Sequence, residues 1–220
     1  AKYYYANGKV SLEGAYLYDE KNGTWKSYNE EGQLEYEEYY VDGLQEGKAK
    51  YYDAGKLERE LEFKDGDRHG TARYYSKAGE LAFELYYDDG MITSYAYLDR
   101  TKKLVKPVQL VNFTGTVEAY YSNGTKSAHI EVAAGLYNGK YNLFNEKGVL
   151  TYESTEEYGS TNGVVKTYYD NGKLRTEFSQ LFDMFDGPYK EYYPDGKLKE
   201  EVRYESGNVH GPYKVYDPTG

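Results

Sequence analysis

The 220-residue chain has no cysteine, so it can form neither a disulfide nor a thiolate metal site. That absence does not settle the compartment; we expect the cell envelope or another extracytoplasmic location, with the cytoplasm as the alternative. No apolar run reaches 18 residues, so no membrane-inserted helix is expected. The 27 basic residues are outnumbered by 37 acidic ones, and the net charge of -10 argues against nucleic acid and anionic membrane surfaces as partners.

Large apolar side chains other than tyrosine are also scarce, which limits the core that the chain could build. Mean hydropathy is -0.92, and there are 2 Met, 7 Phe and a single Trp. Tyrosine is abundant, with 31 residues, and the aromatic content of 18% is too high for a disordered chain. Both facts fit a thin structure with a large surface. The first residue is Ala1 and not Met, so we expect a processed chain.

A recurring phrase contains much of the tyrosine. "YYPDGKLKEE" at 192–201 follows "YYDNGKLRTE" at 168–177 by 24 residues, and "YYDAGKLERE" occurs at 51–60. One set of glycines marks the phrase: Gly8, Gly32, Gly55, Gly79, Gly124, Gly148, Gly172, Gly196 and Gly220. A second set is interleaved with it: Gly23, Gly47, Gly70, Gly115, Gly139, Gly163, Gly187 and Gly211. We interpret both sets as turns, two in each period, which is typical of a repeat protein.

The segments between these glycines alternate apolar and polar residues, which predicts β-strands joined as hairpins. In "LAFELYY" (81–87), Leu81, Phe83 and Leu85 fall on one parity. The predicted fold is all-β, an elongated single-layer antiparallel β-meander of tandem β-hairpin repeats, each about 24 residues long. Two strands in each repeat give roughly 18 to 20 strands. Neighbouring strands lie about 4.8 Å apart, so each repeat should advance the sheet by about 10 Å.

One repeat is degenerate and divides the chain. Residues 93–115 lose both glycines, with Thr93 and Lys102 in the two glycine slots. The segment gains one proline and four basic residues: Pro107, Arg100, Lys102, Lys103 and Lys106. It is either a decayed repeat with a looser turn or a bend that makes a specific contact. The predicted organisation is hairpin repeats over 1–92, the degenerate repeat over 93–115, and hairpin repeats over 116–220.

The register of each hairpin decides which side chains share a face. "YPDGK" (193–197) suits a three-residue loop, in which a type I turn is followed by a left-handed glycine. Tyr193 then pairs with Lys197, and Tyr192 lies opposite Leu198. The slot of Tyr192 is aromatic in nine of ten repeats, so we expect the face of Tyr192 and Leu198 to be structural. The opposite face varies between repeats and is where a partner would be recognised.

An acidic and aromatic set is expected on that variable face in the second to fourth repeats. Its glutamates are Glu35, Glu37, Glu58, Glu60, Glu62 and Glu84. Its aromatic residues are Trp25, Tyr39, Tyr51, Tyr74 and Tyr86. One interpretation is a solvated face that keeps an open sheet soluble. The other is a binding site for a basic protein, because like charges on adjacent hairpins repel one another and a cationic partner would relieve that repulsion.

No catalytic motif, metal site or cofactor site is predicted, so we do not expect an enzyme. His69, His129 and His210 are far apart in the sequence, and no nucleophile motif accompanies them. The glycines are spaced as turns and not as a phosphate-binding loop. The Asp-Gly turns lack the ligand density of a calcium loop.

The segment "YYPDGKLKEEVRYESGNVHGPYKVY" (192–216) resembles the variant MORN repeat of the bacterial YwqK-type antitoxin family. The likeness covers nearly the whole chain and is strongest at 1–90 and 160–220. It rests on the following residues and their counterparts: Tyr192, Tyr193, Asp195, Gly196, Lys197, Leu198, Glu200, Tyr204, Gly207 and Gly211. The resemblance implies an elongated hairpin array that binds other proteins, in some members a toxin, with no catalytic residues to carry over.

Two other functions stay open beside protein binding. Choline-binding repeats are also hairpins with paired aromatics, so a module that binds a cell-surface glycan or the cell wall is one alternative. Those repeats depend on recurring tryptophan for their ligand cages, and this chain has only Trp25. A structural spacer or scaffold is the other alternative.

Overall fold

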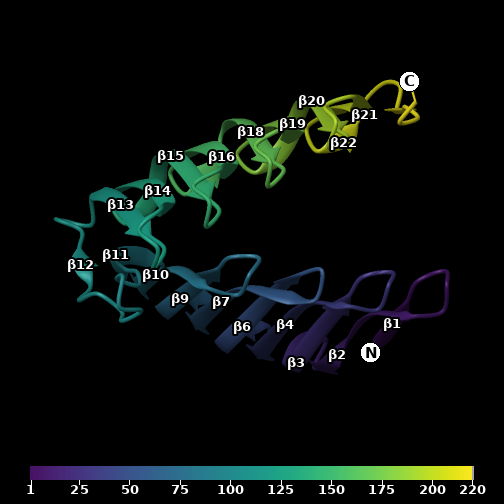
Figure 1. Ribbon diagram of the computed structural model, residues 1–220. Helices are drawn as coiled ribbons and strands as arrows, with labels where there is room; N and C mark the ends of the chain where they lie inside the picture. The colour runs from purple at the N-terminus through teal and green to yellow at the C-terminus, as the bar shows by residue number, and fades with distance from the viewer. Residues whose placement is uncertain (220) are drawn as a thin grey trace. The chain divides into compact units, whose positions relative to one another are not determined.

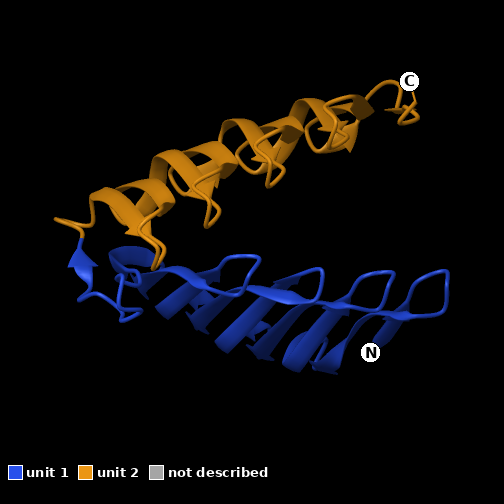
Figure 2. Ribbon diagram, in the orientation of Figure 1, with its two compact units in different colours: residues 1–109 blue, residues 110–220 orange. Residues whose placement is uncertain are grey.

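The computed structural model describes residues 1–219, and no helix occurs among them. Antiparallel strands follow one another in chain order across each of two sheets (Figure 1). The chain divides into two compact units, Ala1–Gln109 and Leu110–Gly220, and the boundary falls inside the degenerate segment 93–115 (Figure 2). The predicted all-β fold of tandem hairpins is confirmed. The described residues contain no helix long and apolar enough to span a membrane.

The sheet of unit 1 has 12 strands and that of unit 2 has 11. Unit 1 contains β1 (Lys2–Tyr4), β2 (Val10–Leu17), β3 (Glu20–Tyr28), β4 (Leu34–Val41), β5 (Leu44–Gln45), β6 (Gly47–Asp53), β7 (Lys56–Lys64), β8 (Asp67–Arg68), β9 (Gly70–Tyr75), β10 (Leu81–Asp88), β11 (Met91–Ala96) and β12 (Val108–Gln109). Unit 2 contains β13 (Gly115–Tyr120), β14 (Lys126–Ala133), β15 (Leu136–Phe144), β16 (Leu150–Glu157), β17 (Ser160–Thr161), β18 (Gly163–Tyr168), β19 (Leu174–Leu181), β20 (Met184–Tyr192), β21 (Leu198–Glu205), β22 (Asn208–Val209) and β23 (Lys214–Val215).

The three-residue loops form as the sequence predicts, except at 53–56, where Asp53 pairs with Lys56 across a two-residue turn. The amide of Tyr193 donates to the carbonyl of Lys197 at 2.8 Å, and Tyr192 lies opposite Leu198. Gly196 has a φ of 96°, the left-handed region that a residue with a Cβ rarely adopts. The degenerate repeat keeps the same loop, because the amide of Asp99 donates to the carbonyl of Lys103 at 2.8 Å. Lys102 occupies the glycine slot there, with a φ of 61°.

The second set of glycines does not form turns, which corrects the sequence interpretation. Gly23 lies inside β3 and Gly139 inside β15, at irregularities in strand pairing. The chain instead reverses at two-residue turns in which both φ angles are positive, the type I′ geometry that suits the twist of a hairpin. These two-residue turns are at 18–19, 42–43, 65–66, 89–90, 112–113, 134–135, 158–159, 182–183 and 206–207.

A β-bulge follows each regular three-residue loop and changes which side chains share a face. Tyr192 lies opposite Leu198, but Glu191 lies opposite Glu200, so Lys199 is an extra residue. The same shift leaves Glu35 and Glu58 as extra residues in unit 1. Beyond each bulge, every side chain lies on the face opposite to the one that simple alternation assigns.

The core lies mainly on one face of each sheet, which we call the apolar face. In unit 1 this face carries Trp25, Ala49, Leu61, Ala72 and Leu85, all buried. In unit 2 it carries Val117, Ile130, Val165 and Val202, also buried. The regular tyrosine and leucine slots share the opposite face, as predicted, but the main core is not on their side. That opposite face is called the charge face below.

Trp25 is the largest fully buried side chain, and a glycine makes its burial possible. A Cβ atom built on Gly14 would lie 2.2 Å from the Trp25 ring, so the indole packs directly against the backbone of β2. The ring edge of Tyr16 lies against it, with centroids 4.8 Å apart. The Trp25 indole N–H donates to the carbonyl of Ala15 at 3.1 Å, which satisfies its polar group.

Candidate functional site

The predicted binding set is divided between the two faces of unit 1, which corrects the expectation that it shares one. Three members lie on the apolar face: Trp25, Tyr51 and Tyr74. Six lie on the charge face: Glu37, Tyr39, Glu60, Glu62, Glu84 and Tyr86. Glu35 and Glu58 are the extra residues of two bulges. The bulges carry no glycine signal, so counting alternate residues placed the second group on the wrong face.

Solvent exposure separates these residues further. Trp25 has 0% of its surface exposed and Glu84 has 4%, so neither presents a surface to a partner. Glu35, Tyr39 and Glu58 are exposed. The other six are half-buried: Glu37, Tyr51, Glu60, Glu62, Tyr74 and Tyr86.

The glutamates of the charge face do not face one another, because a basic residue lies between each pair. One row of directly paired residues crosses unit 1, from β1 to β10: Lys2, Glu13, Lys26, Glu37, Lys50, Glu60, Arg73 and Glu84. We call this the charge row. Acidic and basic side chains alternate in it without exception, and opposite charges directly across a sheet stabilise it. The expected repulsion between glutamates on adjacent hairpins is therefore wrong.

Short ion pairs hold the centre of the row. Glu60 lies 3.1 Å from both Lys48 and Arg73, and Arg73 also lies 2.8 Å from the buried Glu84. Burial alone would raise the pKa of Glu60, but these two cations hold it below its ordinary value. Tyr86 donates its hydroxyl to Glu84 at 2.5 Å. Burial, together with that bond, raises the pKa of Tyr86 to about 12.

Unit 2 has the same row on its charge face. It runs through Glu118, His129, Asn142, Glu153, Lys166, Glu177, Lys190, Glu201 and Lys214. The alternation holds from Glu153 to Lys214. The first hairpin is reversed, because Glu118 stands in a basic slot and His129 in an acidic one, where His129 Nδ1 contacts Glu118, and Asn142 is neutral. The sequence contained this signal, since the basic and acidic members recur at a near-constant spacing. The sequence alone does not show that these residues form one row, because the bulge is what brings them into line.

The aromatic members on the apolar face are engaged within the sheet. The ammonium of Lys21 lies 4.9 Å from the Trp25 ring centre and 4.6 Å from that of Tyr40. This cation–π arrangement fills the one tryptophan-lined cage that the chain could offer. Tyr51 and Tyr40 both donate to Glu38, at 2.8 and 2.7 Å. Burial and the bond to Glu38 raise the pKa of Tyr51 to about 12.

The tyrosine pairs have two separate tasks. Three tyrosines of the regular slot donate to a glutamate of the charge row fifteen residues earlier: Tyr28 to Glu13, Tyr168 to Glu153 and Tyr216 to Glu201. The second tyrosine of a pair donates to a backbone carbonyl of the next repeat, as Tyr169 does to Tyr192 at 2.6 Å. The same bond to the next repeat is made by Tyr5, Tyr121 and Tyr193. Tyrosine is therefore used for both its ring and its hydroxyl.

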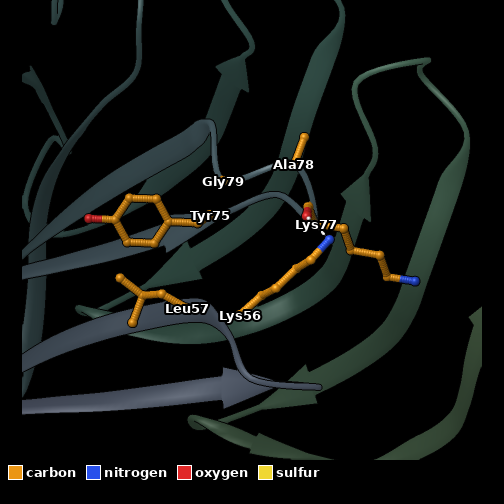
Figure 3. Close-up of a pocket in the computed structure, with 6 residues that line it drawn as sticks. All are labelled: Lys56, Leu57, Tyr75, Lys77, Ala78 and Gly79. Atoms are coloured by element: carbon orange, nitrogen blue, oxygen red, sulfur yellow. Dashed lines mark hydrogen bonds between the residues drawn. The ribbon is translucent and has the colours of Figure 1, made fainter.

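One hollow lies between two neighbouring loops of unit 1. It is an open space of about 420 Å³ between the two-residue turn at 54–55 and the three-residue loop at 77–79, where Lys56 reaches the carbonyl of Lys77 at 3.1 Å (Figure 3). Leu57 and Tyr75 also line it, together with Ala78 and Gly79. Its lining has no carboxylate or histidine, and so offers none of the usual pairs for acid–base or nucleophilic catalysis.

One cluster of metal-ligand type occurs among the described residues. His69 Nδ1 lies 3.6 Å from an oxygen of Asp88 and 3.5 Å from one of Asp89. Both aspartates are exposed at a two-residue turn. Imidazole and carboxylate groups at this spacing could hold a divalent cation.

Comparison with known families supports the repeat interpretation. Five segments match the MORN repeat variant: 21–42, 45–65, 68–89, 161–179 and 185–206. The first of them begins just after one two-residue turn and ends in the next, so it spans one hairpin with its three-residue loop. No curated protein matches the chain. MORN repeats are generally modules that bind proteins or membranes, and proteins made of them are typically not enzymes. Five segments of the chain are therefore similar to the MORN repeat variant, three in unit 1 and two in unit 2.

Proposed function

We propose that the chain is a non-catalytic protein-binding module whose partner is a basic protein. The MORN-variant repeats support a binding function in general. The choice of a basic partner rests on where the excess negative charge lies. In unit 1 the charge row is balanced, with four acidic and four basic residues, so it contributes nothing to the net charge of -10.

Exposed aspartates at the rim of the sheet contribute to the excess negative charge. In unit 1, four two-residue turns each carry an exposed aspartate: Asp19, Asp42, Asp65 and Asp89. Exposed carboxylates that recur at each repeat create an extended negative potential. Such a potential speeds the encounter with a cationic protein and weakens with added salt.

The members of the predicted set keep different roles in this proposal. Glu35, Tyr39 and Glu58 are exposed, and we retain them as contacts with the partner. Glu37, Glu60 and Glu84 hold the sheet together through their basic neighbours. Trp25 supports the partner surface from within the core.

We further propose that the partner is a toxin. It rests on the likeness of the repeats to the YwqK-type antitoxin family, in which a hairpin array neutralises a toxin by binding it. The alternative of a cell-wall or glycan module is less well supported, because Lys21 already fills the space between Trp25 and Tyr40. A passive spacer would have no need of an exposed acidic rim.

The test is affinity capture from a lysate of the native host, with the purified chain as bait and mass spectrometry as the readout. We expect a protein with a basic isoelectric point that is released as salt rises from about 0.05 to 0.5 M. That protein, expressed alone, should arrest growth, and co-expression of the chain should restore it. Capture of no protein, or of an acidic one insensitive to salt, would overturn the proposal of a basic partner. A basic partner without toxicity would overturn only the antitoxin role.

A further inference from the structure

Four of the five two-residue turns of unit 2, those at 134–135, 158–159, 182–183 and 206–207, form an edge that carries several exposed apolar side chains. This turn edge consists of residues 133–136, 157–160, 181–184 and 205–208. Its exposed apolar side chains, with their exposed fractions, are Leu136 38%, Tyr158 75%, Leu181 46%, Phe182 52% and Met184 53%. The three-residue loops on the opposite edge carry none, since 122–124, 146–148, 170–172 and 194–196 contain only Ser, Asn, Gly, Glu, Lys, Asp and Pro. Exposed apolar groups that recur along one edge indicate a contact surface.

The backbone at these turns indicates that the aromatic residues are not incidental. Tyr158 has a φ of 51° and Phe182 a φ of 46°, in the left-handed region. Bulky residues are rare there, and Gly, Asn or Asp usually occupy this slot, as Asp42 and Asp65 do in unit 1. The chain therefore accepts local strain in order to display an aromatic ring at the tip of the turn. Strain of this kind clusters at binding and catalytic sites.

The charge of the turn edge selects among partners. Glu157, Asp183 and Glu205 lie on it, and its sixteen residues include no Lys or Arg. Asp183 accepts the amide of Thr161 and Glu205 lies 3.3 Å from His210, but neither has a Lys or Arg partner among the described residues. An apolar edge bordered by carboxylates fits a surface that is apolar and basic. A second copy of this edge would repel it.

The spacing of the turns and their backbone hydrogen bonds favour a helix over an extended peptide as the bound segment of the partner. Successive repeats advance by about 10 Å, and residues seven apart on an α-helix rise by about 10.5 Å. The turn amides are already used within the sheet, as in the bond from Gly159 to Tyr137 at 2.8 Å. An extended peptide would therefore find no free strand edge to pair with, whereas a helix satisfies its own backbone.

We propose that the turn edge of unit 2 binds a basic amphipathic helix whose apolar residues recur every seventh position. The inference rests on the proposed function and assigns to unit 2 a further contact with the basic partner, in addition to the exposed acidic residues of unit 1. Four turns span about 30 Å, the length of a helix of about 20 residues. The aromatic rings of Tyr158 and Phe182 supply the apolar anchors, and the carboxylates meet the basic flanks.

The experiment uses a synthetic 21-residue peptide with leucine at two positions of each heptad and mostly lysine elsewhere. A scrambled peptide of the same composition controls for charge alone. The edge variant combines Tyr158→Asn, Phe182→Asn and Met184→Thr, substitutions that suit left-handed turns and strands and should leave the fold intact. Tyr18→Asn makes the same change at a 91% exposed turn tyrosine of unit 1 and is the matched control.

We expect the parent and Tyr18→Asn to bind the heptad peptide within twofold of each other, measured by calorimetry. The edge variant, and the parent with the scrambled peptide, should bind at least tenfold more weakly. Equal binding by parent and edge variant, or equal binding of the two peptides, would overturn the inference. So would a dimer of the parent, detected by ultracentrifugation, that the edge variant fails to form. If the partner captured from lysate binds both proteins equally, the inference fails while the proposed function stands; if neither captures one, the proposed function fails.

Discussion

Individual tyrosines in this chain stabilise the fold through both the aromatic ring and the hydroxyl group. The ring of Tyr168 lies in the regular aromatic slot, and its hydroxyl anchors Glu153 within the charge row. The hydroxyl of Tyr169, the next residue in the chain, donates to the backbone carbonyl of Tyr192 in the following repeat. Phenylalanine could supply the rings but not these bonds. The hydrogen bonds that connect one repeat to the next are therefore one reason for the use of 31 Tyr and 7 Phe.

Tyr169→Phe should lower the free energy of unfolding by about 1 kcal/mol, because it leaves a backbone carbonyl without its inter-repeat donor. Tyr158→Phe is the control, since that side chain is 75% exposed at a turn and its hydroxyl is open to water. Urea denaturation followed by circular dichroism measures both. Equal stabilities for the two variants would show that the bond from Tyr169 to Tyr192 contributes nothing.

The pH dependence of stability should depend on Glu60. Its pKa in the folded chain is below its ordinary value, so Glu60 stabilises the fold above about pH 5, and this contribution is lost as pH falls through the folded pKa. Glu60→Gln should be less stable than the parent at pH 7 and should lose less stability between pH 6 and pH 3. Glu58→Gln, at an exposed bulge, should keep the parental slope in the same denaturant titrations. A parental slope for Glu60→Gln would exclude this role.

At the scale of strands and turns, the sequence predicted the hairpins but not their faces. Asp-Gly and Asn-Gly loops fix the pairing of Tyr192 with Leu198, and that pairing is found. The extra residues Glu35 and Glu58 are ordinary exposed residues, so nothing in their chemistry marks a bulge. Each bulge moves the following strand residues to the other face, which is why the predicted site was split.

The positions of the turns between hairpins were predicted wrongly for a similar reason. Glycines such as Gly23 looked like turn residues, whereas turns such as 182–183 contain no glycine at all. Their left-handed geometry is imposed by the pairing of the flanking strands, here Leu181 with Met184. The turn edge, and the aromatic residues displayed on it, therefore became visible only in the structure.

Gly14→Ala tests the packing of a strand against a ring. The added Cβ would lie 2.2 Å from Trp25, so we expect a loss of about 3 kcal/mol and a changed fluorescence of the only tryptophan in the chain. Gly79→Ala, at a loop with a φ of 85° and open space around it, should cost about 1 kcal/mol and leave the fluorescence unchanged. If Gly14→Ala matched Gly79→Ala in both respects, direct packing of Trp25 on Gly14 would be excluded.

At the scale of the whole molecule, charge is used in two ways. Within the charge rows, acidic residues alternate with basic ones and stabilise the sheets. At the rim, aspartates and glutamates exceed nearby cations and give the chain its negative potential. A protein built in this way can bind a cationic partner without weakening its own fold, because the residues that bind are not the residues that hold the strands together.

The most direct test compares two triple variants of the full chain. The row variant carries Glu37→Gln, Glu60→Gln and Glu84→Gln, and the edge variant carries Tyr158→Asn, Phe182→Asn and Met184→Thr. Each is measured for unfolding free energy and for affinity to the heptad peptide. The row variant should lose about 2 kcal/mol of stability, as its cations lose their partners, and should keep its affinity within about threefold. The edge variant should keep its stability and bind at least tenfold more weakly. A row variant that is stable but fails to bind, beside an edge variant that binds normally, would contradict this separation of the residues that bind from the residues that hold the sheet together.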